Sequence, residues 1–208
     1  MSKYLFNPFR YIAGWESMAA GILVLLATSV IGYYSHIHFP DIISVKTNPG
    51  IPYYVLLVEN GLNWLVPSIV LYLAALIFSS SSVRVVDIFG TQALARAPYL
   101  IAAFTGFSGA IDKFGQYTLW KSLNIGDPVI MSTGEILLAV TLMLFMILST
   151  IWMVVLMYNA FKVSANIKGP KLTIVFIVAM VISTAITAFA IYQLFGSHFP
   201  LPAQLVKP

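Results

Sequence analysis

Cysteine is absent from the 208 residues, and charge is scarce, with only 9% of the residues being Asp, Glu, Lys or Arg. Without cysteine the chain can form no disulfide, no thiolate metal site and no cysteine nucleophile. A soluble domain of this length needs far more charge to cover its surface, so a composition that is 60% hydrophobic indicates an integral membrane protein. The length suits a single domain, residues 1–208, because no linker-like stretch divides the chain.

The chain also lacks any cluster of cations, although its 11 Lys and Arg residues outnumber its 7 Asp and Glu residues. Proteins that bind nucleic acid gather their cations into a stripe or patch. Scattered cations are instead typical of the short loops that flank membrane spans. We therefore expect the lipid bilayer to be the main partner of this chain, and we expect no nucleic acid.

Long apolar runs set the expected fold class, because a helix that crosses a hydrocarbon layer of about 30 Å needs about 20 apolar residues. We predict an all-α, polytopic membrane protein with five transmembrane helices plus short interfacial helices. The third run contains only a short uncharged part, so we expect that span to be tilted or partly re-entrant. The predicted spans are 15–34, 53–78, 98–111, 136–158 and 172–195.

The stretch from His36 to Pro52 separates the first two runs and is rich in proline, which predicts a loop. His36, His38 and Asp41 lie in this stretch, and His198 follows the last run. Three imidazoles and a carboxylate are suitable zinc ligands, but their spacing fixes no coordination geometry. We therefore predict ordinary interfacial histidines, no metal and no cofactor.

The distribution of cations predicts the orientation of the spans. Alternate loops hold seven cations on one side (Lys3, Arg10, Arg84, Arg96, Lys162, Lys168 and Lys171) and four on the other (Lys46, Lys113, Lys121 and Lys207). Because cytoplasmic loops carry the excess of Lys and Arg, this count favours a cytoplasmic N-terminus and an outward C-terminus. We expect the bacterial inner, cytoplasmic membrane as the location.

The segment VDIFGTQALARAPYL, residues 86–100, places charge and proline in the middle of an apolar chain. Its apolar residues recur at helical spacing, which predicts a short helix along the inner membrane face. Two interpretations stay open. Arg84, Asp87 and Arg96 form a patch that contacts a protein partner or lipid head groups, or the two arginines extend to the interface and set the topology, with Asp87 as a local partner.

Glu59 is the most unusual side chain within a predicted span, and Asn60 and Asn63 follow it. Glu59 and Asn63 share one helix face, and Pro67 removes the backbone donor that the Asn63 carbonyl would otherwise accept. Charged groups in membranes are costly and often functional, so this face is a candidate ion or proton site. The alternative is that Glu59 lies near the outer end of its span and reaches interfacial water.

Ala102, Gly106 and Ala110 recur at four-residue spacing in the predicted third span. A stripe of small residues lets helix backbones approach closely. Packing within the protein is the simpler interpretation, and contact between copies of the chain in a homo-oligomer is the alternative.

The catalytic motifs GxSxG and HExxH and the P-loop are all absent, and the carboxylates are scattered along the chain. We therefore expect no enzyme. The leading hypothesis is a non-enzymatic scaffold or partner-binding membrane protein that contacts another membrane protein through residues 84–98. A small transporter or channel that uses Glu59, Asn60 and Asn63 is the alternative.

Three stretches together resemble the Yip1 domain family. They are NPF at residues 7–9, VDIFGTQALARAPYL at 86–100 and LMYNAFKVSANIKGPK at 156–171. With five predicted spans, the chain from Asn7 to Phe195 is similar to a short prokaryotic member. The resemblance implies a polytopic membrane protein with a cytoplasmic N-terminus and no catalytic activity. Eukaryotic members associate with Rab GTPases, but this sequence shows no DLYGP-type motif, so Rab binding is assigned to no residue.

Overall fold

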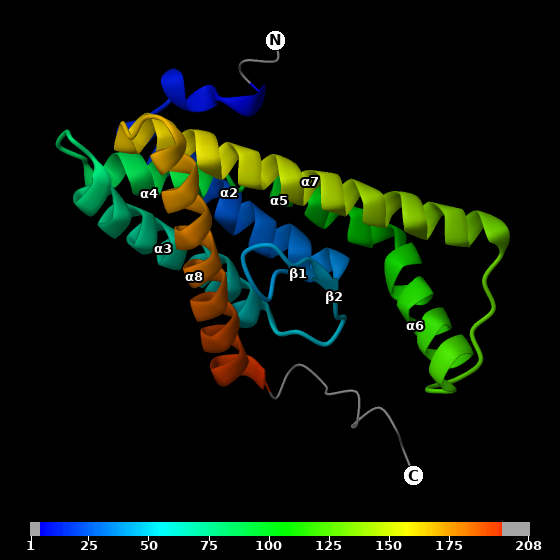
Figure 1. Cartoon of the computed structure of the whole chain (residues 1–208). Helices are drawn as coiled ribbons and strands as arrows, with labels where there is room; N and C mark the ends of the chain where they lie inside the picture. The colour runs from blue at the N-terminus through cyan, green and yellow to red at the C-terminus, as the bar shows by residue number, and fades with distance from the viewer. Residues whose placement is uncertain (1–4, 197–208) are drawn as a thin grey trace.

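Helices make up most of the protein in the computed structural model, which describes residues 5–196 (Figure 1). Within this range four helices are long and apolar enough to cross a membrane. They are α2 (Gly14–Ser35), α3 (Tyr53–Phe78), α7 (Thr133–Ala165) and α8 (Pro170–Phe195). The chain is thus all-α, as predicted, and these helices coincide with four of the five predicted runs.

The remaining elements are short. The helix η1 (Pro8–Arg10) precedes α2, and the strands β1 (Ile37–His38) and β2 (Lys46–Thr47) form an antiparallel hairpin between α2 and α3. Between α3 and α7 lie α4 (Val85–Leu94), α5 (Ala97–Ala103), η2 (Phe104–Ser108) and α6 (Ala110–Leu123). Ser132 and Glu135 form a capping box that begins α7 three residues before the predicted start.

The prediction of one helix over residues 98–111 is wrong, because the chain breaks there twice. The α-helix ends at Ala103, and Gly109 adopts a left-handed conformation with φ of 64°, after which α6 leaves in a new direction. A left-handed residue interrupts helical hydrogen bonding, and glycine adopts it without a steric penalty.

The predicted stripe of small residues is therefore distributed over three elements instead of one helix face. Ala102 lies on α5, Gly106 on η2 and Ala110 on α6. All three still pack within the protein: the two alanines are buried, and Gly106 lies against the backbone of Ser35 in α2.

The segment from α4 to η2 runs along the whole length of α2 in the same direction. The pairs that lie side by side are Gly14 and Asp87, Gly21 and Ala93, and Ser35 and Gly106. Any Cβ on Gly21 or Gly90 would collide with the backbone of the opposite helix, so only glycine permits this approach. The predicted short helix is present as α4, and one of its faces packs closely against α2.

Polar side chains of α4 also point into the protein. Gln92 Nε2 donates to the Met157 carbonyl at 3.0 Å, and Thr91 Oγ1 lies 3.1 Å from Ser164 Oγ. Both side chains are buried and bonded to α7, so this face of α4 packs within the protein.

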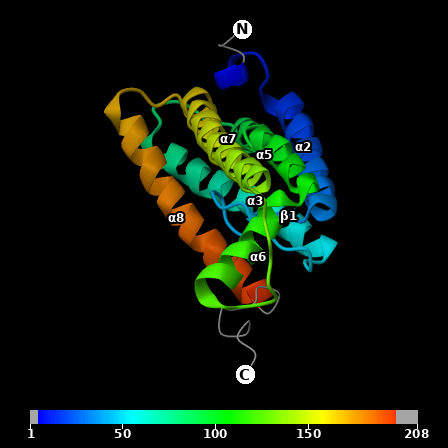
Figure 2. The same ribbon diagram turned by 90° about the vertical axis from the view of Figure 1, so that its right-hand side faces the viewer.

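The last two helices diverge. Although α7 and α8 follow one another in sequence, they contact each other little, and α8 packs chiefly against α3 (Figures 1 and 2). Near the turn between them, the Tyr158 and Phe176 rings meet at 5.3 Å. An apolar groove lies between α7 and α8, and Ile43 at the tip of the hairpin is part of its lining.

Candidate functional site

The predicted loop between α2 and α3 is a hairpin that folds back into the protein. His36 ends α2 in a left-handed conformation with φ of 60° and reverses the chain. Asp41 Oδ1 accepts two backbone N–H groups, from Ile43 at 2.9 Å and Ser44 at 2.8 Å, and so fixes the tip. The apolar side chains of the hairpin fill the core, since Ile37, Phe39 and Ile42 are completely buried.

Glu59 and Asn63 of α3 hold the hairpin by the backbone of one residue. Glu59 Oε2 accepts the Phe39 N–H at 3.0 Å, and Asn63 Nδ2 donates to the Phe39 carbonyl at 2.7 Å. The prediction that these two side chains share a helix face is confirmed. Together they satisfy the backbone N–H and C=O of Phe39, a fully buried residue whose polar groups would otherwise be costly to bury.

His38 completes the surroundings of the Glu59 carboxylate. Its ring nitrogen Nδ1 lies 3.0 Å from Glu59 Oε1, and both side chains are buried. We assign the proton to Nδ1, because an ionised carboxylate only accepts hydrogen bonds. Glu59 is 0% exposed, so this carboxylate is held by protein groups and does not reach interfacial water.

Arg96 reaches the same cluster from the start of α5. Its Nη1 donates to the Asn63 carbonyl at 3.1 Å, which is the carbonyl predicted to be free because of Pro67. The guanidinium also lies over the Tyr99 ring, 5.2 Å from its centroid, where a cation–π interaction offsets part of the cost of burial. Arg96 is only 1% exposed, so the interpretation that it extends to the interface is wrong.

Tyr99 connects Arg96 to the hairpin, a role that the sequence analysis did not predict. Its ring stacks on Phe39 with centroids 4.6 Å apart, and its hydroxyl donates to the Ile42 carbonyl at 3.1 Å. We use the term hairpin cluster for the six residues that meet here: His38, Phe39, Glu59, Asn63, Arg96 and Tyr99. A tyrosine three residues after an arginine within an apolar run was the available signal.

The other predicted site residues lie elsewhere. Asn60 Nδ2 donates to Ser29 Oγ at 3.0 Å and joins α3 to α2 on a different face. Arg84 and Asp87 form a local ion pair at 2.7 Å, with the arginine exposed. The predicted patch of Arg84, Asp87 and Arg96 is therefore divided between this surface pair and the buried cluster.

The histidines make no metal centre among the residues that the structure describes. No group of three His, Asp or Glu side chains gathers within residues 5–196. His36 is exposed, His38 is bonded to Glu59, and His198 lies outside the described residues.

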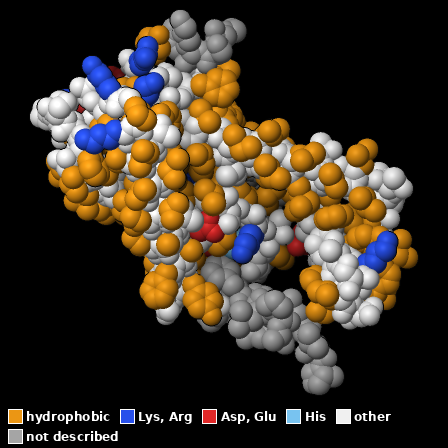
Figure 3. Space-filling view, in the orientation of Figure 1, with side chains coloured by type: hydrophobic (Ala, Val, Ile, Leu, Met, Phe, Trp, Pro, Cys, Tyr) orange, Lys and Arg blue, Asp and Glu red, His pale blue; other side chains and the backbone are white. Residues whose placement is uncertain are grey.

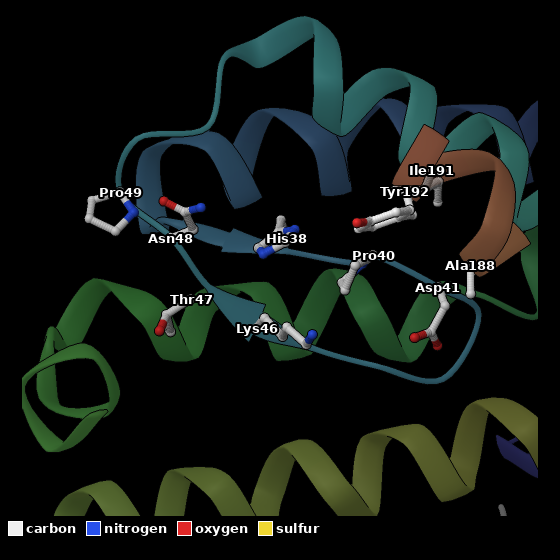
Figure 4. A pocket seen from close by; sticks show the side chains of 10 residues that line it. All are labelled: His38, Pro40, Asp41, Lys46, Thr47, Asn48, Pro49, Ala188, Ile191 and Tyr192. Carbon is white, nitrogen blue, oxygen red and sulfur yellow. The ribbon is translucent and has the colours of Figure 1, made fainter. Parts of the chain in front are cut away.

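A polar pocket lies where the hairpin meets α8 (Figure 4). Its volume is about 490 Å³, within the range of small-ligand sites. It is lined by His38, Pro40, Asp41, Lys46, Thr47, Asn48, Pro49, Ala188, Ile191 and Tyr192. Because His38 both lines this pocket and bonds Glu59, the pocket is joined directly to the hairpin cluster.

Different residues hold the hairpin in place and face the pocket. Glu59, Asn63 and Tyr99 bond to the hairpin backbone from the buried side, whereas Asp41 and Lys46 stand on the pocket side (Figure 4). A rigid hairpin that presents charges of both signs is suited to binding a small polar group. Comparisons with protein-family models, with curated proteins and with solved structures find no match for this chain.

Proposed function

We propose that this protein is a non-enzymatic, multi-pass membrane protein that acts by binding, and that the polar pocket beside the hairpin is its binding site. One observation carries the proposal: a hairpin built of buried residues is fixed by Glu59 and Asn63 so that its polar side faces a pocket. Burying the Glu59 carboxylate and the Arg96 guanidinium is costly in free energy. Their presence in so apolar a protein favours a functional role, which we identify as holding the hairpin in place beside the pocket.

Five crossings are part of this proposal, with residues 85–108 as the third. The segment is broken, but it covers the full length of α2, about 33 Å for 22 residues at helical rise. Its parallel course supports a topology in which α6 lies on the side of the membrane opposite the connection between α3 and α4. Membership of the Yip1 domain family, which residues 7–195 resemble in sequence, is part of the same proposal.

The charged ends support an N-terminus in the cytoplasm. In Figure 3, Lys and Arg gather at the end where α7 joins α8. Among the described residues, five cations lie at that end (Arg10, Arg84, Lys162, Lys168 and Lys171) and three at the hairpin end (Lys46, Lys113 and Lys121). Arg96 no longer counts as a loop charge, yet the excess of cations stays on the same side.

Mass spectrometry of native-nanodisc preparations tests the binding proposal. Proteins, lipids and small molecules that co-purify with the wild type are compared with those of an Asp41→Asn, Lys46→Gln variant and of an Arg84→Gln, Asp87→Asn variant. We expect a component that the pocket variant loses and the surface variant keeps. Identical sets from all three proteins would refute a binding role for the pocket.

A second candidate is a small transporter or channel that uses Glu59 and Asn63, with His38 in place of the predicted Asn60. The contact between His38 and Glu59 favours this candidate, because the His38 ring lines the open pocket and also bonds the buried carboxylate. Proton or cation flux into proteoliposomes, reduced by Glu59→Gln, would support it. An impermeable membrane would refute it.

A further inference from the structure

The polar pocket adjoins an apolar groove between α7 and α8. The groove has a volume of about 520 Å³, and Ala188 lines both spaces. Val154 of α7, Phe176 and Met180 of α8 and Ile43 from the tip of the hairpin form its walls. A polar pocket beside an apolar groove complements an amphipathic ligand, whose polar part would lie in the pocket and whose apolar part would lie in the groove.

The position of both spaces along α8 matches the depth of one membrane leaflet. The 26 residues of α8 extend about 39 Å, compared with a hydrocarbon layer of about 30 Å. Ala188 and Tyr192 fall in the last third of the helix, near the head-group boundary. From Ala188 back to Phe176 the groove follows α8 for about 18 Å, slightly more than half of the hydrocarbon thickness.

The charges in the pocket have both signs and remain apart. Asp41 and Lys46 extend to the same side of the hairpin (Figure 4). In the described part of the chain neither residue takes part in an ion pair. Thr47 and Asn48 add polar groups nearby. A ligand that carries one anionic and one cationic group complements this lining, whereas a purely anionic ligand would place negative charge beside Asp41.

We propose that the pocket and groove bind a zwitterionic phospholipid whose head group carries a primary ammonium, as in phosphatidylethanolamine. The phosphate lies at Lys46, the ammonium donates to Asp41, and an acyl chain occupies the groove between α7 and α8. A choline head group lacks N–H donors and is recognised by several Phe, Tyr or Trp rings, whereas Tyr192 is the one such ring of the described lining. This inference rests on the proposed function, because it names the ligand of that same pocket.

Native mass spectrometry of the full-length protein tests the assignment. Delipidated protein is titrated separately with phosphatidylethanolamine, phosphatidylcholine and phosphatidylglycerol of identical acyl chains, and with soluble phosphoethanolamine. We expect the wild type to prefer phosphatidylethanolamine by roughly tenfold, the ratio that one charged hydrogen bond provides. Asp41→Asn keeps the oxygen that fixes the hairpin tip and removes the charge, so it should abolish the preference. Lys46→Gln should weaken binding of all three lipids.

Two controls separate this site from general lipid adhesion. Lys121→Gln removes an exposed cation on the same side of the protein, and Leu148→Phe enlarges an exposed side chain of α7 outside the groove. Both should bind as the wild type does. Ala185→Phe fills the groove and should release the lipid while leaving phosphoethanolamine binding unchanged.

The outcomes distinguish the two proposals. Equal binding of the three lipids, unchanged in the Asp41 and Lys46 variants, would overturn the lipid assignment. Binding of phosphoethanolamine without any lipid preference would also overturn it, while a binding role for the pocket would stand. If no lipid or head group binds and the nanodisc comparison shows no pocket-dependent component, both proposals fail.

Discussion

Replacing Glu59 by alanine should release the hairpin from α3. The substitution removes both carboxylate oxygens, of which one accepts the Phe39 N–H and the other bonds the His38 ring, each at 3.0 Å. Hydrogen bonds to a charged group contribute about 1.5–3 kcal/mol each, and the unfolded chain in a bilayer finds partners of its own, so the lower end applies. We expect the free energy of unfolding to fall by about 3 kcal/mol, measured by titrating sodium dodecyl sulfate into mixed micelles.

Glu59→Gln is the matched comparison. Its amide oxygen can still accept the Phe39 N–H, and its NH₂ can donate to Nδ1 of the other His38 tautomer, so we expect a loss of about 1 kcal/mol or less. Glu16→Ala removes an exposed carboxylate from α2 and should leave the stability unchanged.

A cysteine at Ile42 reports the position of the hairpin directly, since the sequence contains no other cysteine. In the Ile42→Cys protein the thiol should react slowly with maleimide, because residue 42 is completely buried. Adding Glu59→Ala should accelerate labelling, whereas Glu59→Gln should not. If the alanine variant is as stable and as slowly labelled as its parent, the hairpin does not depend on Glu59, and our reasoning about the cluster is wrong.

Three further predictions concern the rest of the molecule. Gly21→Ala should lower the free energy of unfolding by about 1–3 kcal/mol, because the added Cβ would meet the backbone of α4. Gly61 has no neighbour within 4 Å of an added Cβ, so Gly61→Ala should be neutral or stabilising by up to about 1 kcal/mol in the same titration. Single cysteines at Ser82 and Leu123 should be labelled by a membrane-impermeant maleimide from opposite sides of the membrane; labelling from the same side would exclude a crossing by residues 85–108. Arg84→Gln should leave the melting temperature unchanged, because its ion pair with Asp87 is at the exposed end of α4.

Hydropathy was sufficient to predict the long helices, because α2, α3, α7 and α8 each hold an apolar run long enough to stand out. It could not predict the role of residues 85–108. Arg96, Gln92 and Thr91 interrupt that run, and they are tolerated because their partners come from α3 and α7. Hydropathy averages over a window of the chain and contains no information about such distant partners.

The candidate site, too, could be predicted from the sequence only in part. Helical periodicity placed Glu59 and Asn63 on one face, and the effect of Pro67 on the Asn63 carbonyl followed from covalent geometry. The contribution of the hairpin could not be predicted, because proline and polar residues normally indicate an exposed loop. Only the tertiary structure brings His38 and Phe39 to that face.

The parallel course of α2 and α4 has a consequence for biosynthesis. In the proposed five-crossing topology α2 and α4 cross in the same direction and cannot be neighbours in sequence, so α3 would leave the translocon before α2 meets its tightest partner. Until α4 arrives, the face of α2 that carries Ser17 and Gly21 exposes mainly small and polar side chains to lipid, and these gain little free energy from an apolar solvent. The first two helices are therefore a poor stopping point for insertion. Nascent chains that end near Phe78 should stay bound to the insertion machinery, and chains extended past Ser108 should be released.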